Sequence, residues 1–361
     1  MRLLFVSGNL CDGGAQRVIS IVASELAERG NEVFLLLFSR NEKEYPVSAK
    51  VVIRSLGNNY AEYSKISGFR RVRIVRRIVK EIHPEAAVGF LEGGYGLYIS
   101  TLGMRFPKIA SSRIKPDIIM RAKGIRGFSD RLWFCHADAV VLQNEEQRNQ
   151  APLEKWNNCI VIPNPLPQEA LDATPRVNGE VKRIVMVGRL AEQKNYQLMI
   201  EAMKVVHQQH PDIVLDIFGK GHLESLLTDE IEHAGLCNAI HLRGWTQDTI
   251  QEYQNSDLFV LSSDYEGMPN ALMEAMAVGI PCISTDCETG PKELIEDGVN
   301  GLLVPVGDKD KLIQAIEHIV SMDMEERRRI SMAAKDKMTK CYTKQIIADE
   351  WEALFSQLIH S

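Results

Sequence analysis

Two carboxylates stand in a short stretch that could bind a ligand rich in hydroxyl groups. Glu266 lies in a polar turn after a buried-looking strand, and Glu274 follows eight positions later in a helix-like run. Asn270 is a plausible N-cap, which would place Glu274 near the first turn of that helix. The N–H groups of a helix start bind anions, and a carboxylate on the same helix can accept two hydrogen bonds from a vicinal diol. A Glu near a helix start is also often only a dipole partner.

Two cations lie between a predicted strand at 182–188 and a second candidate helix start. Arg189 and Lys194 precede a helix that begins near Tyr196. Together with the N–H groups of that helix, two cations can neutralise a diphosphate without a metal ion. Taken alone, the stretch could also be a solvated loop.

These two stretches resemble the retaining glycosyltransferases of family 4, which have the architecture called the B fold. The order of strand, Glu, Gly, Pro, Asn, second Glu and Ala-Met-Ala-x-Gly-x-Pro matches the paired-Glu motif of that family, and residues 188–195 match its Gly-Arg-Leu-x-x-x-Lys-Asn segment. The likeness is tight over residues 180–310 and loose in the first half. It implies an α/β fold with two Rossmann-like, doubly wound parallel-sheet domains that face a cleft.

The resemblance also implies roles for individual residues. Arg189 and Lys194 would bind the donor pyrophosphate and stabilise the leaving nucleoside diphosphate, Glu266 would hold the sugar, and these three are the candidate catalytic residues. The family retains anomeric configuration, and same-face attack assisted by the leaving phosphate is expected. The candidate donor-binding residues are Gly14, Arg189, Lys194, Gly244, Glu266, Met268, Pro269, Asn270, Ala271, Leu272 and Glu274.

Chain length and pattern predict two domains. The chain has 361 residues, and its start reads as strand, glycine-bearing loop, helix and strand, a Rossmann-type opening without a GxGxxG fingerprint. Three prolines between 163 and 167 mark the clearest break. We therefore expect an acceptor-binding domain at 1–165, a nucleotide-sugar-binding domain at 166–345, and a last helix at 346–361 that crosses back to the first domain.

A basic amphipathic helix is predicted at 69–82. Its apolar residues fall on one face, and six cations crowd the remainder with one carboxylate. Such a charge run is usually a solvated surface, but a basic amphipathic helix is also typical of binding to an anionic membrane or to an acceptor pyrophosphate. Arg70, Arg73 and Arg77 are the candidates for this contact.

Two further residues are candidates for acceptor contacts in the first half. Glu92 follows a predicted strand at 86–90, and Arg113 follows a strand at 108–112. Structural ion pairing is about as plausible for both. Many members of family 4 carry a His after the second of these strands, and this chain has Ser111-Ser112-Arg113 there, so no His-based acceptor role is assigned.

Composition excludes several classes of protein. The net charge of −6 argues against a nucleic-acid partner, and no apolar run approaches the roughly 18 residues that span a bilayer. The seven cysteines are scattered without zinc spacing, which is typical of reduced thiols in a cytosolic protein. Neither a metal nor a cofactor is expected. The expected location is cytoplasmic and peripheral to the inner face of the plasma membrane.

The sequence as a whole favours a hexosyltransferase. It would move a hexose or N-acetylhexosamine from a nucleotide sugar, with a weak preference for UDP, to a glycan or lipid-linked acceptor in surface polysaccharide or glycolipid synthesis. A nucleotide-sugar epimerase of the same fold would need no acceptor, and a phosphorylase would usually be much longer. A non-catalytic nucleotide-sugar-binding module is the third alternative, and the presence of all four charged residues argues against it.

Overall fold

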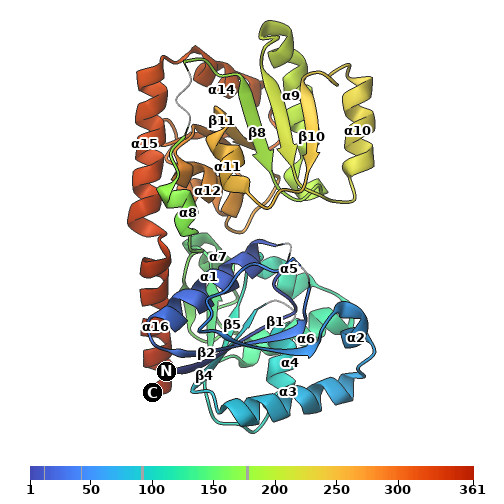
Figure 1. Cartoon of the computed structure of the whole chain (residues 1–361), viewed down its shortest axis with the longest axis vertical. Coiled ribbons are helices and arrows are strands. Elements are labelled where there is room, and N and C mark those ends of the chain that lie inside the picture. Colours follow the sequence, from blue (N-terminus) through green and yellow to red (C-terminus); the bar gives the residue numbers. More distant parts are fainter. Residues whose placement is uncertain (12, 42, 91–92, 176–178) are drawn as a thin grey trace. The chain divides into compact units, whose positions relative to one another are not determined.

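The computed structural model describes residues 1–11, 13–41, 43–90, 93–175 and 179–361. The chain divides into two compact units, Met1–Pro165 with Lys344–Ser361, and Leu166–Thr343. Each unit is built on one parallel β-sheet with helices along it (Figure 1). The predicted fold class, two Rossmann-like parallel-sheet domains, is confirmed.

The first unit holds a seven-stranded sheet of order β3-β2-β1-β4-β5-β6-β7. Its strands are β1 (Arg2–Ser7), β2 (Glu32–Ser39), β3 (Val52–Gly57), β4 (Ala86–Phe90), β5 (Lys108–Ser111), β6 (Ala139–Leu142) and β7 (Cys159–Val161). Its helices are α1 (Gly14–Glu28), α2 (Tyr60–Ser64), α3 (Gly68–Ile82), α4 (Gly93–Ser100), α5 (Pro116–Arg121), α6 (Gly124–His136), α7 (Glu145–Gln150) and α16 (Lys344–Ile359).

The core of this unit explains why the chain returns to it at the end. Strands β1 and β4 are apolar on both faces, as expected for central strands covered on both sides. Helix α16 covers one face, where Trp351 stacks on Phe355 with ring centroids 5.6 Å apart, and both rings contact Phe5 of β1. Arg29 adds ion pairs to two carboxylates of α16. The last helix is therefore part of the first unit's core.

The second unit holds a six-stranded sheet of order β10-β9-β8-β11-β12-β13. Its strands are β8 (Arg183–Val187), β9 (Val214–Phe218), β10 (Ile240–Gly244), β11 (Leu258–Leu261), β12 (Cys282–Thr285) and β13 (Leu302–Val304). Its helices are α8 (Gln168–Asp172), the 3-10 turn η1 (Glu192–Lys194), α9 (Tyr196–Gln209), α10 (Glu224–His233), α11 (Thr249–Gln254), α12 (Asn270–Val278), α13 (Pro291–Leu294), α14 (Lys309–Ser321) and α15 (Met324–Cys341).

Strand order fixes where this second sheet can bind a ligand. The chain first runs outward from β8 to β10 and then returns to place β11 on the other side of β8. Ligands of doubly wound sheets bind beyond the carboxyl ends of the strands at such a reversal. The two loops at that point are residues 188–195 after β8, which carry Arg189 and Lys194, and residues 262–269 after β11, which carry Glu266.

The predicted cap of α12 is wrong. Pro269 is the N-cap, its carbonyl accepts the N–H of Met273 at 3.1 Å, and Asn270 is the first helical residue. The ring of Pro269 fixes an extended backbone that is ready to enter a helix, so the helix starts one residue earlier than it would with Asn270 as its cap. Glu274 is consequently the fifth residue of α12 and lies beyond its first turn.

Two other features bear on cellular context. In the part of the chain that the structure describes, no helix combines the length and apolar composition needed to cross a bilayer. All seven cysteines are free thiols, and three of them are buried.

Candidate functional site

A buried ion pair lies at the strand-order reversal of the second sheet. Lys194 Nζ donates to Glu266 Oε1 at 2.6 Å, and only 14% and 8% of the two side chains are exposed. Lys194 comes from the loop after β8 and Glu266 from the loop after β11, 72 residues later. In so little water the attraction between the charges is strong, and the loss of either partner would leave an uncompensated buried charge. The two loops are thus held together by the charges proposed to do chemistry.

Three uncharged side chains also donate hydrogen bonds to Glu266. Ser263 Oγ donates to Oε1 at 2.7 Å, and Gln193 Nε2 donates to Oε2 at 3.3 Å. The hydroxyl of Thr289 donates to the backbone carbonyl of Glu266. The carboxylate is therefore oriented from the loop after β8 and from its own loop. None of these three donors was singled out from the sequence, although Ser263 lies only three residues before Glu266.

Further hydrogen bonds tie the two loops to each other. Asn195 adopts a left-handed backbone with φ of 45°, caps α9 through Leu198 N, and donates from Nδ2 to Asp264 at 2.7 Å. The hydroxyl of Ser262 donates to the carbonyl of Lys194 at 2.8 Å. Because Asn tolerates the left-handed region better than most residues, one side chain here supports the turn, the helix and the crosslink.

Glycine is required at two close approaches around the pair. A Cβ on Gly188 would lie 2.9 Å from Cε of Lys194, so the missing side chain leaves room for the lysine. Gly290 has φ of 94°, and a Cβ there would lie 2.6 Å from the carbonyl oxygen of Gly267. The missing Cβ thus lets the side chain of Lys194 pack against Gly188 and the backbone of Gly267 pack against Gly290.

Tyr196 lies beside the ion pair at the start of α9. Its ring is 1% exposed, and its hydroxyl donates to the carbonyl of Arg189 at 3.4 Å. Burial, with a smaller contribution from the charge of Glu266, raises the pKa of the phenol well above its ordinary value. Tyr196 is therefore a neutral hydrogen-bonding and packing residue, and no pattern in the sequence marks it as part of the site.

Glu274 is also buried, and it lies on the side of α12 that faces α11. It is 3% exposed, and Thr249 Oγ1 donates to its Oε2 at 3.2 Å. Helix α12 also begins in this region, and the first N–H groups of an α-helix have no acceptor inside the helix. A carboxylate and a helix amino end thus come from one element, as the sequence suggested, although Glu274 lies deeper in the helix than expected.

The remaining residues predicted to bind the nucleotide-sugar donor differ in exposure and in contacts. Arg189 is exposed, and no described residue forms an ion pair with its guanidinium. Gly244 ends β10 with φ of 73°, and its carbonyl accepts the N–H of Gly219 at 2.8 Å. Met268 and Leu272 are buried in the apolar core beneath α12. Pro269 and Asn270 form the helix start, and Ala271 packs partly against that core.

The other predicted residues belong to the first unit. Gly14 begins α1 after the extended Gly13. Glu92 lies outside the described residues. Arg113 is buried, and Nη1 donates to Oδ1 of Asn164 at 2.8 Å, so the ion pair weighed for it is not formed among the described residues. Arg70, Arg73 and Arg77 are exposed on α3, and Nε of Arg77 lies 3.8 Å from Oε1 of the exposed Glu81.

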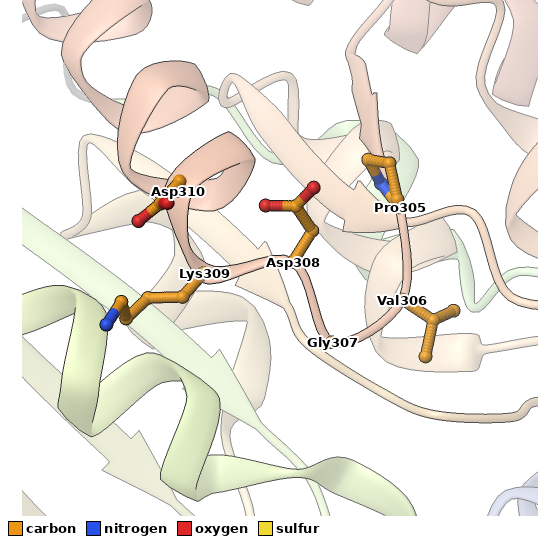
Figure 2. A pocket seen from close by; sticks show the side chains of 6 residues that line it. All are labelled: Pro305, Val306, Gly307, Asp308, Lys309 and Asp310. Atoms are coloured by element: carbon orange, nitrogen blue, oxygen red, sulfur yellow. The ribbon is translucent and has the colours of Figure 1, made fainter.

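A hollow in the second unit is lined by none of these charged residues. It has a volume of about 480 Å³ and is lined by the turn between β13 and α14, residues 305–310 (Figure 2). The turn contains an Asp-x-Asp triplet, Asp308-Lys309-Asp310, a pattern that can hold a divalent cation. Asp308 instead caps α14 by accepting the N–H of Lys311 at 2.9 Å. Among the described residues, no group of three or more His, Cys, Asp or Glu side chains is arranged to hold a metal ion.

The second unit matches a known protein family. Residues 167–337 match the model of a family described as glycosyl transferases group 1. Along its length the chain is similar to an uncharacterized glycosyltransferase of Haemophilus influenzae, 25% identical over 354 residues that cover 95% of this chain and 96% of that protein. It is also similar to AmsD of Erwinia amylovora, described as an amylovoran biosynthesis glycosyltransferase, at 24% identity over 361 residues and 99% of that protein.

Solved structures share the fold over nearly the whole chain. A sucrose-phosphate synthase from Thermosynechococcus elongatus superposes with a TM-score of 0.82 at 16% identity, covering 99% of this chain and 98% of that one. HepE of Anabaena in complex with UDP and glucose superposes with a TM-score of 0.78 at 18% identity, covering 99% and 100%. At such identities the likeness shows the fold alone. Residues 167–337 therefore match the group 1 family model, and the chain is similar to glycosyltransferases over most of its length.

Proposed function

We propose that this chain is a retaining hexosyltransferase that moves a hexose or N-acetylhexosamine from a UDP-sugar to a glycan or lipid-linked acceptor. The observation that carries the proposal is the buried Lys194–Glu266 pair at the strand-order reversal of the second sheet. A cation and a carboxylate fixed 2.6 Å apart can serve two neighbouring parts of one ligand, its phosphates and its sugar. The family match of the second unit supports this assignment.

In this proposal each charged residue has a separate task. Lys194, joined by the exposed Arg189 and the amino end of α12, neutralises the negative charge that develops on the departing diphosphate. Glu266 accepts hydrogen bonds from the sugar, and Glu274 accepts them from the ribose diol. Two cations and helix amides suffice for the leaving group, so we infer that no metal ion is needed. The acceptor hydroxyl attacks the anomeric carbon from the face that the phosphate leaves, and the bond from that carbon to the phosphate oxygen breaks. The hydroxyl proton passes to the departing phosphate, and configuration is retained.

The choice of donor and pathway rests on relatives. AmsD is described as a biosynthetic enzyme of the polysaccharide amylovoran, and HepE was solved with UDP and glucose. These names favour a UDP-sugar and a role in surface polysaccharide or glycolipid synthesis for this chain as well.

A panel of nucleotide sugars tests the proposal. UDP-sugars should raise the melting temperature, since a ligand at about 100 times its Kd adds roughly 2.7 kcal/mol to the free energy of unfolding. Wild type should transfer sugar with EDTA present, as expected if no metal ion is needed. In Glu266→Ala, UDP should still bind while sugar transfer is lost. Unchanged transfer in Glu266→Ala would contradict the proposal, and interconversion of two UDP-sugars without an acceptor would indicate an epimerase.

We also propose that α3 of the first unit contacts an anionic membrane. Arg70, Arg73, Arg77 and Lys80 are exposed on it, and the ring of Phe69 at its start is 74% exposed. Arg71 and Arg76 instead donate to carbonyls of the unit itself, which fixes the helix with the other cations outward. Cations beside an exposed aromatic ring fit the headgroup region of an anionic bilayer.

Vesicle sedimentation tests this contact. Wild type should sediment with vesicles of phosphatidylglycerol and phosphatidylcholine and not with phosphatidylcholine alone. Each exposed cation contributes about 1 kcal/mol, so Arg70→Glu with Arg73→Glu and Arg77→Glu should remove binding. The control is Arg148→Glu, which reverses the charge of an exposed arginine on α7. Equal binding by the triple variant and wild type would contradict the proposal.

A further inference from the structure

A second buried cation lies in the first unit, and it lacks a counter-charge. Arg113 follows β5, is 9% exposed, and its guanidinium lies over the ring of Phe90 at 5.2 Å. Nη1 donates to Asn164, but Nε and Nη2 are buried and have no hydrogen-bond acceptor. No carboxylate of the described residues pairs with it. Burial lowers the pKa of this guanidinium to about 9, which leaves it charged at neutral pH.

The two unsatisfied nitrogens form the edge with which arginine holds an oxyanion. The N–H bonds of Nε and Nη2 point the same way, so they can donate in parallel to two oxygens of one carboxylate or phosphate. Arg183 of the second unit uses the same edge, donating from Nε to Asp216 at 2.5 Å and from Nη2 to Glu252 at 3.2 Å. Arg113 presents this edge without any acceptor.

The surroundings of Arg113 are polar and fixed. Oδ1 of Asn164 accepts from both Arg113 and Nε2 of Gln143, which follows β6, and Gln143 exchanges hydrogen bonds with Gln147 of α7. Asn164, Gln143 and Gln147 are each at most 3% exposed, and the cluster lies beyond the carboxyl ends of β5, β6 and β7. The hydroxyl of Ser111 at the end of β5 is also buried without a partner. Buried donors of a native protein almost always have acceptors, so this cluster lacks one group.

We propose that the Nε–Nη2 edge of Arg113 binds an oxyanion of the acceptor, a carboxylate of an acidic sugar or a phosphate. The inference rests on the proposed function, since only a transferase has an acceptor. It deepens that function by assigning the chemical class of the acceptor. Because both nitrogens are covered in the ligand-free protein, binding requires the neighbouring side chains to shift.

Calorimetric titration of the full chain saturated with UDP tests the proposal. Saturation occupies the donor site, so an added anion cannot bind to Arg189 and Lys194. The probes are glucuronate for the carboxylate, glucose 1-phosphate for the phosphate, and glucose as the neutral sugar, all at matched ionic strength. Wild type should bind at least one anionic probe 10-fold or more tightly than glucose, and the better probe identifies the source of the oxyanion.

Variants separate this role from a structural one. Arg113→Met should abolish the preference for anions while UDP binding stays unchanged, and Arg113→Lys, which keeps the charge without the paired donors, should weaken it. The matched control is Arg71→Met, since Arg71 also stacks on a ring, that of Tyr63, but donates to carbonyls. Equal affinity for glucose and both anions in wild type, or unchanged preference in Arg113→Met and Arg113→Lys, would overturn the proposal. Failure of wild type to bind UDP would instead overturn the proposed function.

Discussion

Lys194 and Arg113 are two buried cations in very different states. Lys194 of the second unit has a carboxylate at 2.6 Å, and that carboxylate has two further donors. Arg113 of the first unit has one amide oxygen as its acceptor and two donors unused. A folded protein tolerates a buried charge mainly when it is paired. We infer that the proposed donor site is electrostatically complete before a ligand arrives, whereas the proposed site at Arg113 is completed by its ligand.

The largest expected effect is that of Lys194→Met. It removes leaving-group stabilisation, so turnover should fall by about 10²- to 10³-fold. It also leaves Glu266 buried without its cation, so the free energy of unfolding should fall by roughly 3–5 kcal/mol. Denaturant unfolding and a transfer assay measure the two losses. The control, Lys182→Met, breaks the exposed pair with Glu180 and should change stability by less than about 1 kcal/mol. Equal effects of the two variants would refute the comparison.

Glu266→Gln should separate charge from shape at the same site. The amide can still accept from Ser263, but it no longer neutralises Lys194, so we expect a turnover loss of about 10²-fold. UDP affinity should not fall, because the charge of Lys194 is then no longer neutralised by a carboxylate and can attract the diphosphate. Initial rates and calorimetry provide the measurements. A variant with full turnover, or one that lost UDP binding along with turnover, would show that Glu266 acts otherwise.

Arg113→Met should have the opposite effect on stability from Lys194→Met. Removal of an unpaired buried cation relieves its desolvation, so the ligand-free variant should melt a few degrees above wild type. Thermal unfolding followed by circular dichroism measures the shift. If the variant instead melted well below wild type, Arg113 would be a satisfied structural residue, and the contrast between the two cations would be lost.

Acid stability should change least, and it depends on a third arrangement, a carboxylate shared by two arginines. Burial raises the pKa of Asp216, but hydrogen bonds from Arg243 and Arg183 outweigh it, and the pKa lies below its ordinary value. A lowered folded pKa means stabilisation that is present above the unfolded pKa of about 3.9 and lost as the pH falls below it. The arginines are partly exposed, so Asp216→Asn should lower stability at pH 7 by only about 1 kcal/mol.

The pH dependence of that difference is the check. The free energies of unfolding of wild type and Asp216→Asn should differ at pH 7. They should converge as the pH falls from about 4 through the lowered folded pKa of Asp216, because only below that pKa is the carboxyl protonated in both states. A difference that stayed constant from pH 7 to pH 3 would mean that the charge of Asp216 does not contribute to stability.

The sequence predicted the frame of the second unit's site because two short-range signals determine it. Apolar runs identify β8 and β11, and the loops after them meet wherever a doubly wound sheet reverses its order, which brings Lys194 to Glu266. The cap of α12 was misjudged because Pro269 supplies the start that an Asn usually supplies. The helix α8 was missed since it is five residues long and lies in a stretch that prolines mark as irregular.

Other parts could not be predicted because they depend on distant residues. Thr289 reaches the backbone of Glu266 across 23 positions, and Thr249 reaches Glu274 across 25. Threonine is common, and nothing in its local pattern marks such a contact. Arg113 was singled out for its place after a strand, but the unsatisfied state of its Nε and Nη2 depends on how Phe90 and Asn164 enclose it.

Calorimetric titration of UDP into wild type, Arg189→Ala, Lys194→Ala and the control Lys182→Ala tests the central claim most directly. If the cations of the loop after β8 hold the diphosphate, wild type and the control bind alike, and each site variant loses 10-fold or more in affinity, about 1.4 kcal/mol. Equal UDP affinity in all four proteins would place the nucleotide elsewhere and contradict the account.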